Sequence, residues 1–329
     1  MNAVPTGEVV ENAVLLAGRA PSLHNSQPWR WIFDGATLRL FAVPGRVLAA
    51  ADPSGRQRLL SCGIMLDHLR TAMAAAGWRT LTARFPDPNH LDHLATLRFT
   101  PAQIVTDADR DRAAAIATRR TDRLPFTAPT GWDRFEPVLR ALIDPADAMV
   151  DVLGDDSRPR LADASELTAA LRRYNSDYQA ELQWWAGHVI ADFGIPRSAL
   201  VTGEEQARVT IGRTFPAVAA QSRRIGIVDH SRILVLSTDT DDHDNLLRCG
   251  EALSAALLGC TVTGYATCTL THLTELPSAR AIVAELTGRK ALPQALIRVG
   301  IAPEPAESPA PTPRRPLADI LAVDNAPTA

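Results

Sequence analysis

The feature that most constrains the fold is an internal repeat. When the 329-residue chain is aligned with itself at an offset of 187, residues 59–82 (LLSCGIMLDHLRTAMAAAGWRTLT) match residues 246–269 (LLRCGEALSAALLGCTVTGYATCT) at eight positions. A repeat of this size indicates a duplicated unit whose copies fold alike. The alternative is that two alanine-rich helices align by composition alone, but the shared Cys-Gly start and Gly-aromatic end favour duplication.

Each copy predicts a long buried helix between strands. The helices are expected over 60–76 and 247–263, and each is followed by a glycine, Gly77 or Gly264, that suits the left-handed conformation just beyond a helix end. Apolar, strand-like runs flank both helices, at 37–43 and 94–100 in the first copy and at 231–237 and 294–300 in the second. The repeat therefore predicts an α+β chain whose two long helices pack against each other at the centre.

The two predicted halves differ in one large segment. We place them at residues 1–104 and 105–329, each as a small sheet covered by helices. Residues 160–225 have no counterpart in the first half and predict a helical, lid-like insertion over a site. Trp184 and Trp185 are its candidate lid residues, and the alternative is that both fill the core of a helical hairpin.

Composition and charge exclude several classes of protein. A net charge of -3, with 22% charged and 46% hydrophobic residues, argues against a general nucleic-acid surface. The chain has neither an apolar run long enough for a membrane span nor a signal-peptide pattern, so we expect a cytoplasmic protein without nucleic-acid or membrane partners. Its four cysteines form no C-x-x-C pair, which predicts buried free thiols and no metal site.

Each half carries a polar motif that the other lacks. The first half has APSLHNSQPWRW at 20–31, where Ser22 and Asn25 can hydrogen bond to the edge of a flat heterocycle. The second half has ATRRTDRLPF at 117–126, behind a helix opened by the capping-box pattern TDAD at 106–109. If the halves pack about a pseudo-twofold axis, the two motifs meet across the interface and form one composite site.

The RRTDR segment favours an anion. Arg119, Arg120 and Arg123 are clustered with the hydroxyl group of Thr121, and guanidinium groups donate charge-assisted hydrogen bonds to phosphate. Arg119 and Arg123 share a face if the preceding helix continues, and Asp122 would partly offset their charge. The alternative is a solvated basic helix end that complements the helix dipole.

Together, the repeat and the motifs resemble the FMN-dependent nitroreductase superfamily, and most closely its mycobacterial Acg-type branch. APSLHNSQPWRW is similar to the family's flavin-ring loop, RRTDRLPF to its Arg-Arg-Ser-x-Arg phosphate motif with Thr for Ser, and PRRPLADIL at 313–321 to its C-terminal tail. The family usually forms homodimers whose flavin sites use both subunits. The resemblance implies a nitroreductase-like fold in which the two halves of one monomer mimic that dimer and share one site.

The resemblance also implies a role for each candidate residue. The FMN phosphate would be held by Arg119, Thr121, Arg314 and Arg315, with Arg120 in the same motif. Arg123 would approach the N1 and O2 edge of the flavin, where a cation stabilises the reduced anion. The flavin ring and ribityl chain would be contacted from the first half by Pro21, Ser22, Leu23 and Asn25, with Gln27 tying the loop to backbone groups. Thr269 and Leu270 would lie along the opposite face of the ring.

The implied function is an FMN oxidoreductase with no catalytic side chain of its own. NAD(P)H would visit transiently, since no G-x-G-x-x-G motif occurs, and a nitroaromatic, quinone or similar small molecule would accept the electrons. A flavin-sequestering protein with a lid and little turnover, and an FMN-dependent dehydrogenase of a biosynthetic intermediate, remain as alternatives. His24 is a weak candidate for a catalytic residue, because a lone histidine more often forms structural hydrogen bonds.

Overall fold

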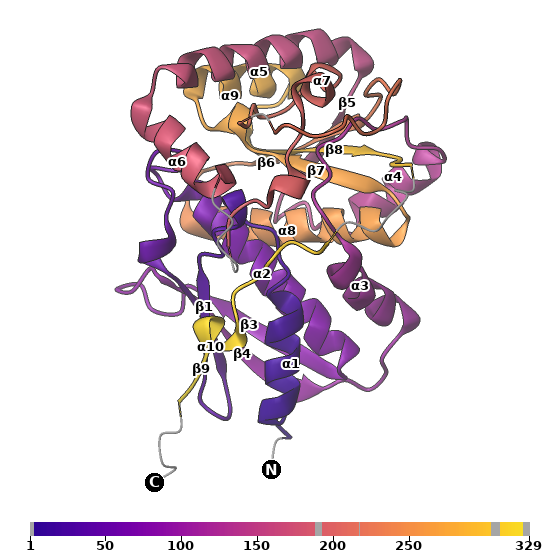
Figure 1. Cartoon of the computed structure of the whole chain (residues 1–329). Helices are drawn as coiled ribbons and strands as arrows, with labels where there is room; N and C mark the ends of the chain where they lie inside the picture. The colour runs from indigo at the N-terminus through magenta and orange to yellow at the C-terminus, as the bar shows by residue number, and fades with distance from the viewer. Residues whose placement is uncertain (1–2, 188–192, 217, 304–309, 325–329) are drawn as a thin grey trace.

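The computed structural model describes residues 3–187, 193–216, 218–303 and 310–324. The helices are α1 Gly7–Ala17, α2 Arg56–Ala75, α3 Asp107–Thr118, α4 Trp132–Ala141, α5 Arg158–Arg173, α6 Ser176–Gly187, α7 Gly203–Ala207, α8 His243–Val262, α9 Pro277–Thr287 and α10 Leu317–Ile320. The strands are β1 Trp29–Phe33, β2 Leu38–Ala42, β3 Trp78–Arg84, β4 His93–Pro101, β5 Met149–Leu153, β6 Arg232–Thr238, β7 Ala266–Leu270, β8 Leu292–Gly300 and β9 Leu321–Val323. They form two halves, with α2 and α8 between the two sheets (Figure 1).

The two sheets confirm the predicted duplication. Strands β3, β4, β2 and β1 lie in the same spatial order in the first sheet as β7, β8, β6 and β5 in the second. Every pair among these strands is antiparallel in both sheets. The register even shifts at equivalent places, after Leu40 in β2 and after Leu236 in β6. The chain therefore has the predicted α+β architecture of two similar halves.

The central helices α2 and α8 cross at two glycines that the repeat aligns. A β-carbon on Gly63 would lie 2.1 Å from the carbonyl oxygen of Leu247, and one on Gly250 would lie 2.2 Å from that of Leu60. The offset of 187 pairs Leu60 with Leu247 and Gly63 with Gly250. Such reciprocal contacts are those of a twofold interface, so the halves pack about a pseudo-twofold axis.

Both central helices are confirmed but begin four residues before their predicted starts. At α2, the carboxylate of Asp52 accepts hydrogen bonds from the backbone N–H groups of Gln57 and Arg58 at 3.0 and 2.8 Å. At α8, the side chain of Asp242 accepts one from the N–H of Asn245 at 2.9 Å. These carboxylates satisfy the free N–H groups of the first turn, which explains the additional turn.

The C-terminal segment returns to the first half. β9 pairs in parallel with β1, with Leu321 opposite Trp31, and so completes the first sheet (Figure 1). Trp29 and Trp31 are fully buried in β1, as expected for rings that start a strand. The division into residues 1–104 and 105–329 stays a prediction, and the tail packs across it.

The insertion expected at 160–225 contributes most of α5, α6 and α7. α5 lies beside α9 over the outer face of the second sheet (Figure 1). α6 is attached to the first half, because the carboxylate of Glu181 accepts hydrogen bonds from the N–H groups of Ala50 and Ala51 at 3.0 and 2.9 Å. The insertion therefore bridges the halves.

The four cysteines are buried free thiols. Among the described residues, no helix combines the length and apolar character needed to cross a membrane.

Candidate functional site

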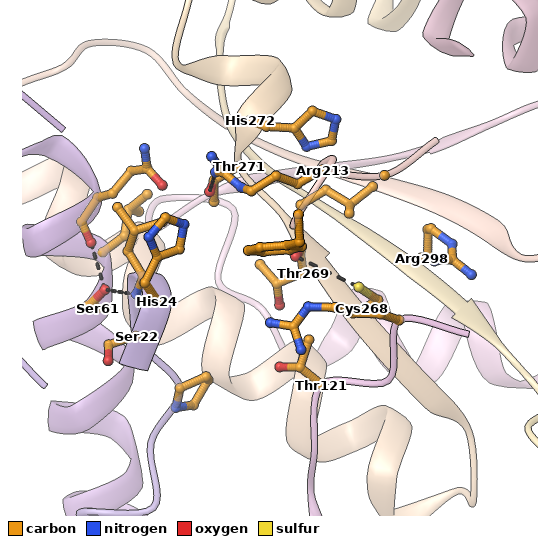
Figure 2. Close-up of a pocket in the computed structure, with 18 of the residues that line it drawn as sticks. Ser22, His24, Ser61, Thr121, Arg213, Cys268, Thr269, Thr271, His272 and Arg298 are labelled. Carbon is orange, nitrogen blue, oxygen red and sulfur yellow. Dashed lines mark hydrogen bonds between the residues drawn. The ribbon is translucent and has the colours of Figure 1, made fainter. Parts of the chain in front are cut away.

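Two adjoining cavities lie where the halves meet. We call the first the inner cavity; its volume is about 110 Å³. Figure 2 shows one wall of this cavity with Ser22, His24 and Ser61. The opposite wall carries Arg213, Thr269 and His272. The second, of about 340 Å³, is the arginine cavity, and its lining includes Arg19, Arg119 and Arg314. Six residues line both cavities: Pro21, Ser22, His24, Thr121, Arg123 and Val201. The two predicted motifs therefore meet at one place.

The first-half loop is held in an unusual backbone conformation. His24, Asn25 and Gln27 have φ values of 50°, 60° and 51°, in the left-handed region that side chains disfavour. Neighbouring groups enforce it: the N–H of Gln27 donates to Ser22 Oγ at 2.9 Å, and Gln27 Oε1 accepts from the N–H of Arg315 at 2.9 Å. Gln27 thus ties the loop to the C-terminal tail, and strain of this kind is characteristic of binding sites.

The RRTDR segment corrects one expectation. α3 begins with the predicted capping box of Thr106 and Asp109 but ends at Thr118, so Arg119 and Arg123 do not share a helical face. The chain turns extended at Arg119, and the N–H of Asp122 donates to the carbonyl of Thr267 in β7 at 2.9 Å. This contact with β7 is what brings the segment alongside the inner cavity.

The carboxylate of Asp122 has two cationic neighbours. It forms an ion pair with Arg224 of the insertion, with Nη2 and Oδ2 at 2.5 Å. It also attracts Arg123 of the motif and raises the pKa of that guanidinium against the larger lowering by burial, so it offsets the motif's charge in part.

The arginine cavity concentrates positive charge. The Arg119 residue is only 6% exposed, and its Nε has no hydrogen-bond partner in the described part of the chain. Burial and repulsion from Arg19 lower the pKa of Arg119 to about 10. Burial, followed by repulsion from Arg119 and Arg19, lowers the pKa of Arg314 to about 9. Buried cations of this kind require an anionic partner, so the cavity is suited to a multiply charged anion.

The other arginines predicted for the phosphate differ in placement. Arg314 lines the cavity, but its Nε and Nη2 donate to the carbonyls of Gly18 and Arg19 at 3.0 and 2.9 Å, at the C-terminal end of α1. Arg120 is exposed at the cavity wall. Arg315 lies elsewhere, because its guanidinium packs 4.6 Å above the centre of the Phe193 ring.

The inner cavity has one cationic and one neutral polar group near its entrance to the arginine cavity. Burial lowers the pKa of Arg123, whose guanidinium lies 5.0 Å from the Phe215 ring centre and donates to the carbonyl of Ala199 at 3.1 Å. Burial, with repulsion from Arg213 and Arg123, holds the pKa of His24 well below its usual value. Its imidazole is therefore neutral at physiological pH.

His24 is not the structural hydrogen bonder that the sequence suggested. Neither of its ring nitrogens has a hydrogen-bond partner among the described residues, although the residue is buried. It lines both cavities. Two unsatisfied nitrogens at this place indicate that a ligand completes the site.

The remaining first-half and β7 candidates line the cavities, but Asn25, predicted to contact the ring and ribityl chain, lines the arginine cavity and not the inner one. Pro21, Ser22 and Leu23 line the inner cavity from one half, and Thr269 and Leu270 line it from the other. Asn25 lines the arginine cavity, and its Nδ2 donates to the carbonyls of Gly194 and Pro313 at 3.0 and 3.1 Å. The predicted composite arrangement is therefore present in the geometry.

Sequence reasoning missed several lining residues. The central helices contribute Gln57, Leu60, Ser61, Ile64 and Leu253, and the second half contributes Arg213, Phe215, His272 and Arg298. Except for Gln57, the helix residues lie inside the repeat, so the predicted helix–helix interface was the one available signal for them. The others lie in no recognisable motif.

The insertion covers the inner cavity with residues other than the predicted tryptophans. Trp184 is 48% exposed, and Trp185 packs against Leu48 of the first half and Phe193, with ring centres of Trp185 and Phe193 5.4 Å apart. Neither tryptophan is among the residues that line the two cavities, because α6 turns its apolar side toward the first half. The cavity wall is formed instead by Val201, Gln206, Val209, Gly212, Arg213 and Phe215.

The place related to the inner cavity by the pseudo-twofold axis is occupied by an ion pair. The offset of 187 relates the lining residues Ile64 and Thr271 to Glu251 and Arg84. Arg84 Nε donates to Glu251 Oε1 at 2.6 Å, and Glu251 also pairs with Arg70 at 2.5 Å. Charged side chains thus stand at two described positions that are equivalent to lining residues of the inner cavity.

Comparison with known proteins identifies the family. No family model matches the chain. The Acg protein of Mycobacterium tuberculosis, provisionally named an NAD(P)H nitroreductase, is 54% identical over 319 residues, which cover 97% of this chain and 96% of Acg. The M. tuberculosis protein Rv3127 is 51% identical over 97% of this chain and 94% of its own. PigM of Serratia sp., also provisionally named an NAD(P)H nitroreductase, is 25% identical over 95% of this chain and 93% of its own.

Solved structures give a more distant likeness. The FMN and NADPH-dependent nitroreductase NfnB from Sphigopyxis sp. strain HMH aligns with 64% of this chain and 97% of its own, at 18% identity and a TM-score of 0.43. The family assignment therefore rests on the sequence relatives. With a relative 54% identical over 97% of its length, the chain belongs to the NAD(P)H nitroreductase family, in the branch that contains Acg.

Proposed function

We propose that this protein is an NAD(P)H-dependent oxidoreductase that binds one FMN between its halves. The main support is a cavity lined by the buried Arg119 and the half-buried Arg19 and Arg314, which adjoins a second, less charged cavity. A phosphate dianion would supply the negative charge that these side chains lack, and a flat ring would extend into the inner cavity. The names of the Acg-type relatives agree with this activity.

The residues present fit FMN. Arg119, Thr121 and Arg314 would hold the phosphate, since all three line the arginine cavity and the Nε of Arg119 lacks a partner. Arg123 would place a positive charge beside the ring. The apolar walls that would enclose the ring come from Leu23, Leu60, Ile64, Leu253 and Leu270. FMN held there would supply the redox chemistry between NAD(P)H and a flat acceptor such as a nitroaromatic or quinone.

The chain's own residues would bind, orient and shield. His24 is neutral, so one of its nitrogens would donate a hydrogen bond to a ligand and the other would accept one. Residues 201–215 of the insertion would exclude water from the inner cavity. No side chain is assigned to proton transfer, and the proton that accompanies hydride to the acceptor would come from solvent.

A single site in a single chain follows from the same geometry. The α2–α8 crossing is internal, and the Arg84–Glu251 pair occupies the related place. We therefore propose that the protein is a monomer with one flavin.

The attachment of the insertion favours a second candidate function, which is retention of the flavin with slow turnover. Besides Glu181, Arg172 ties the insertion to the first half, because its Nη1 donates to the carbonyl of Ala50 at 3.2 Å. A cover held at both points would restrict access of NAD(P)H.

Anaerobic reduction separates the two functions. We expect the visible flavin bands of the FMN-loaded protein to bleach within seconds of adding excess NADPH or NADH. Bleaching that takes hours, and that becomes fast in Glu181→Gln, would support retention behind a fixed cover. A flavin that dithionite reduces but neither nucleotide reduces in either protein would contradict both the activity and the gate.

A further inference from the structure

A third cavity lies behind the inner cavity, under the insertion. This outer cavity, of about 300 Å³, lies between α5, α6 and the segment 213–216. Three residues line it and the inner cavity together: Arg213, Phe215 and His272. One ligand could therefore have one end in each cavity, with these side chains around its middle.

The outer cavity has an excess of positive charge. Arg172, Arg173 and Arg213 line it, and none of the described residues in its lining is acidic. Glu275, whose side chain is fully buried, pairs with Arg213 and lies 3.7 Å from Arg172. One carboxylate thus meets two of the three guanidinium groups. Arg173 is exposed at the α5 side of the cavity, so its charge can attract an anion from solution.

A buried polar atom at the boundary between the cavities lacks a partner. His272 Nε2 contacts Ser165 Oγ at 2.7 Å, but its Nδ1 has no hydrogen-bond partner among the described residues. The residue is 2% exposed, and burial lowers its pKa well below the usual value. An unsatisfied nitrogen in such a place indicates that a ligand, or a water that accompanies it, completes the hydrogen bonding.

The other walls are suited to a ring. Tyr178, Leu182 and Phe215 give the outer cavity aromatic and aliphatic surfaces. The guanidinium of Arg172 lies 4.4 Å above the Tyr178 ring centre, and that arrangement keeps a planar cation beside an apolar wall. Planar guanidinium groups beside aromatic surfaces bind carboxylates in two-point contacts.

We propose that the outer cavity binds the carboxylate of the electron acceptor, so that the preferred acceptors are small aromatic acids. This inference rests on the proposed function, because the reducible end of the molecule would lie in the inner cavity. Arg173 is the specificity-determining residue, because it attracts the carboxylate of the acceptor. Arg172 and Arg213 form ion pairs with Glu275 and so fix the wall of the cavity.

The test compares 4-nitrobenzoate with its uncharged analogue 4-nitrobenzamide on the FMN-loaded protein. Arg173→Met is expected to raise KM for 4-nitrobenzoate roughly tenfold, as for the loss of one charge-assisted hydrogen bond. Its kcat, and both constants for 4-nitrobenzamide, stay within about twofold. Arg160→Met is the matched control, because Arg160 lies on the same helix and pairs with Glu285 at 2.6 Å outside the cavity.

Calorimetric binding of 4-nitrobenzoate to the same proteins separates failure of the subsite from failure of the proposed function, since it requires no turnover. Binding that weakens in Arg173→Met without any turnover of either compound would support the subsite and count against the activity. The subsite would be overturned if Arg173→Met raised KM equally for 4-nitrobenzoate and 4-nitrobenzamide, or if it left KM for 4-nitrobenzoate unchanged. A change confined to KM for NADPH would assign the cavity to the 2′-phosphate of the reductant and would also overturn it.

Discussion

Replacing Arg119 with methionine is expected to weaken FMN binding about 100-fold while making the flavin-free protein more stable. The loss follows from removing a charge-assisted contact to the phosphate, worth about 1.5–3 kcal/mol. The gain follows from the pKa of Arg119, which burial and Arg19 lower from its ordinary value to about 10. A cation with a folded-state pKa below its unfolded value destabilises the fold at every pH below about 10, and the penalty falls as the pH rises above 10 toward the unfolded pKa. At pH 7 the penalty is on the order of 3 kcal/mol.

Fluorescence titration with FMN and urea unfolding of the flavin-free protein measure the two effects. Arg298→Met is the matched control, since Arg298 is equally buried but pairs with Asp229 at 2.6 Å. Its removal leaves the buried Asp229 with one cationic partner among the described residues, Arg158 at 3.4 Å, besides hydrogen bonds from Phe126 N–H and Ser231 Oγ, and should destabilise the protein by about 3 kcal/mol. If Arg119→Met destabilised the flavin-free protein like this control, or left FMN affinity unchanged, the anion site would be wrong.

Replacing Gly63 with alanine is expected to destabilise the protein by about 3 kcal/mol or more, because the added methyl group overpacks the helix crossing. The new β-carbon would lie 2.1 Å from the backbone oxygen of Leu247 and 2.8 Å from the α-carbon of Gly250. Backbone atoms cannot turn aside, so the two halves must separate. A loss of that size is a large fraction of the stability of a typical domain, about 5–15 kcal/mol. Thermal and urea unfolding measure the change.

Gly259→Ala is the control for the crossing. Gly259 lies on α8, but its added β-carbon would meet the Cδ1 end of the flexible Leu142 side chain, at 2.6 Å. Rotation of that side chain should limit the loss to about 1 kcal/mol. Equal stability of the two variants would mean that the helices do not cross at Gly63, and the pseudo-twofold packing would have to be abandoned.

The fold was predictable from the sequence in the segments that the repeat covers. Equal spacing of the Cys-Gly and Gly-aromatic pairs predicted both central helices and the strands beside them. The pairing of β9 with β1 was not predictable, because nothing in LADILAV specifies a partner more than 280 residues away. The starts of the helices were displaced by Asp52 and Asp242, whose side chains extend the first turn.

The two motifs of the site were predictable from the sequence, but the insertion residues that cover the inner cavity were not. The loop at Pro21–Gln27 and the Arg119–Arg123 segment combine residue types that together suit a phosphate and a flat ring. Arg213 and Phe215 have no such context, since their position depends on how the insertion folds against both halves. Arg315 shows the limit of transferring a motif, because its neighbour Arg314 lines the cavity while Arg315 packs on Phe193.

The most direct test of a single FMN site between the halves of one chain is the number of flavins per chain, measured together with the mass of the particle in solution. After saturation with FMN and gel filtration, absorbance and light scattering should give one FMN in a monomer of 35.5 kDa. That result is expected because the two motifs form one site between the halves and the Arg84–Glu251 pair occupies the other place. A dimer with two flavins at intermolecular interfaces, two flavins in one chain, or no retained FMN would contradict it.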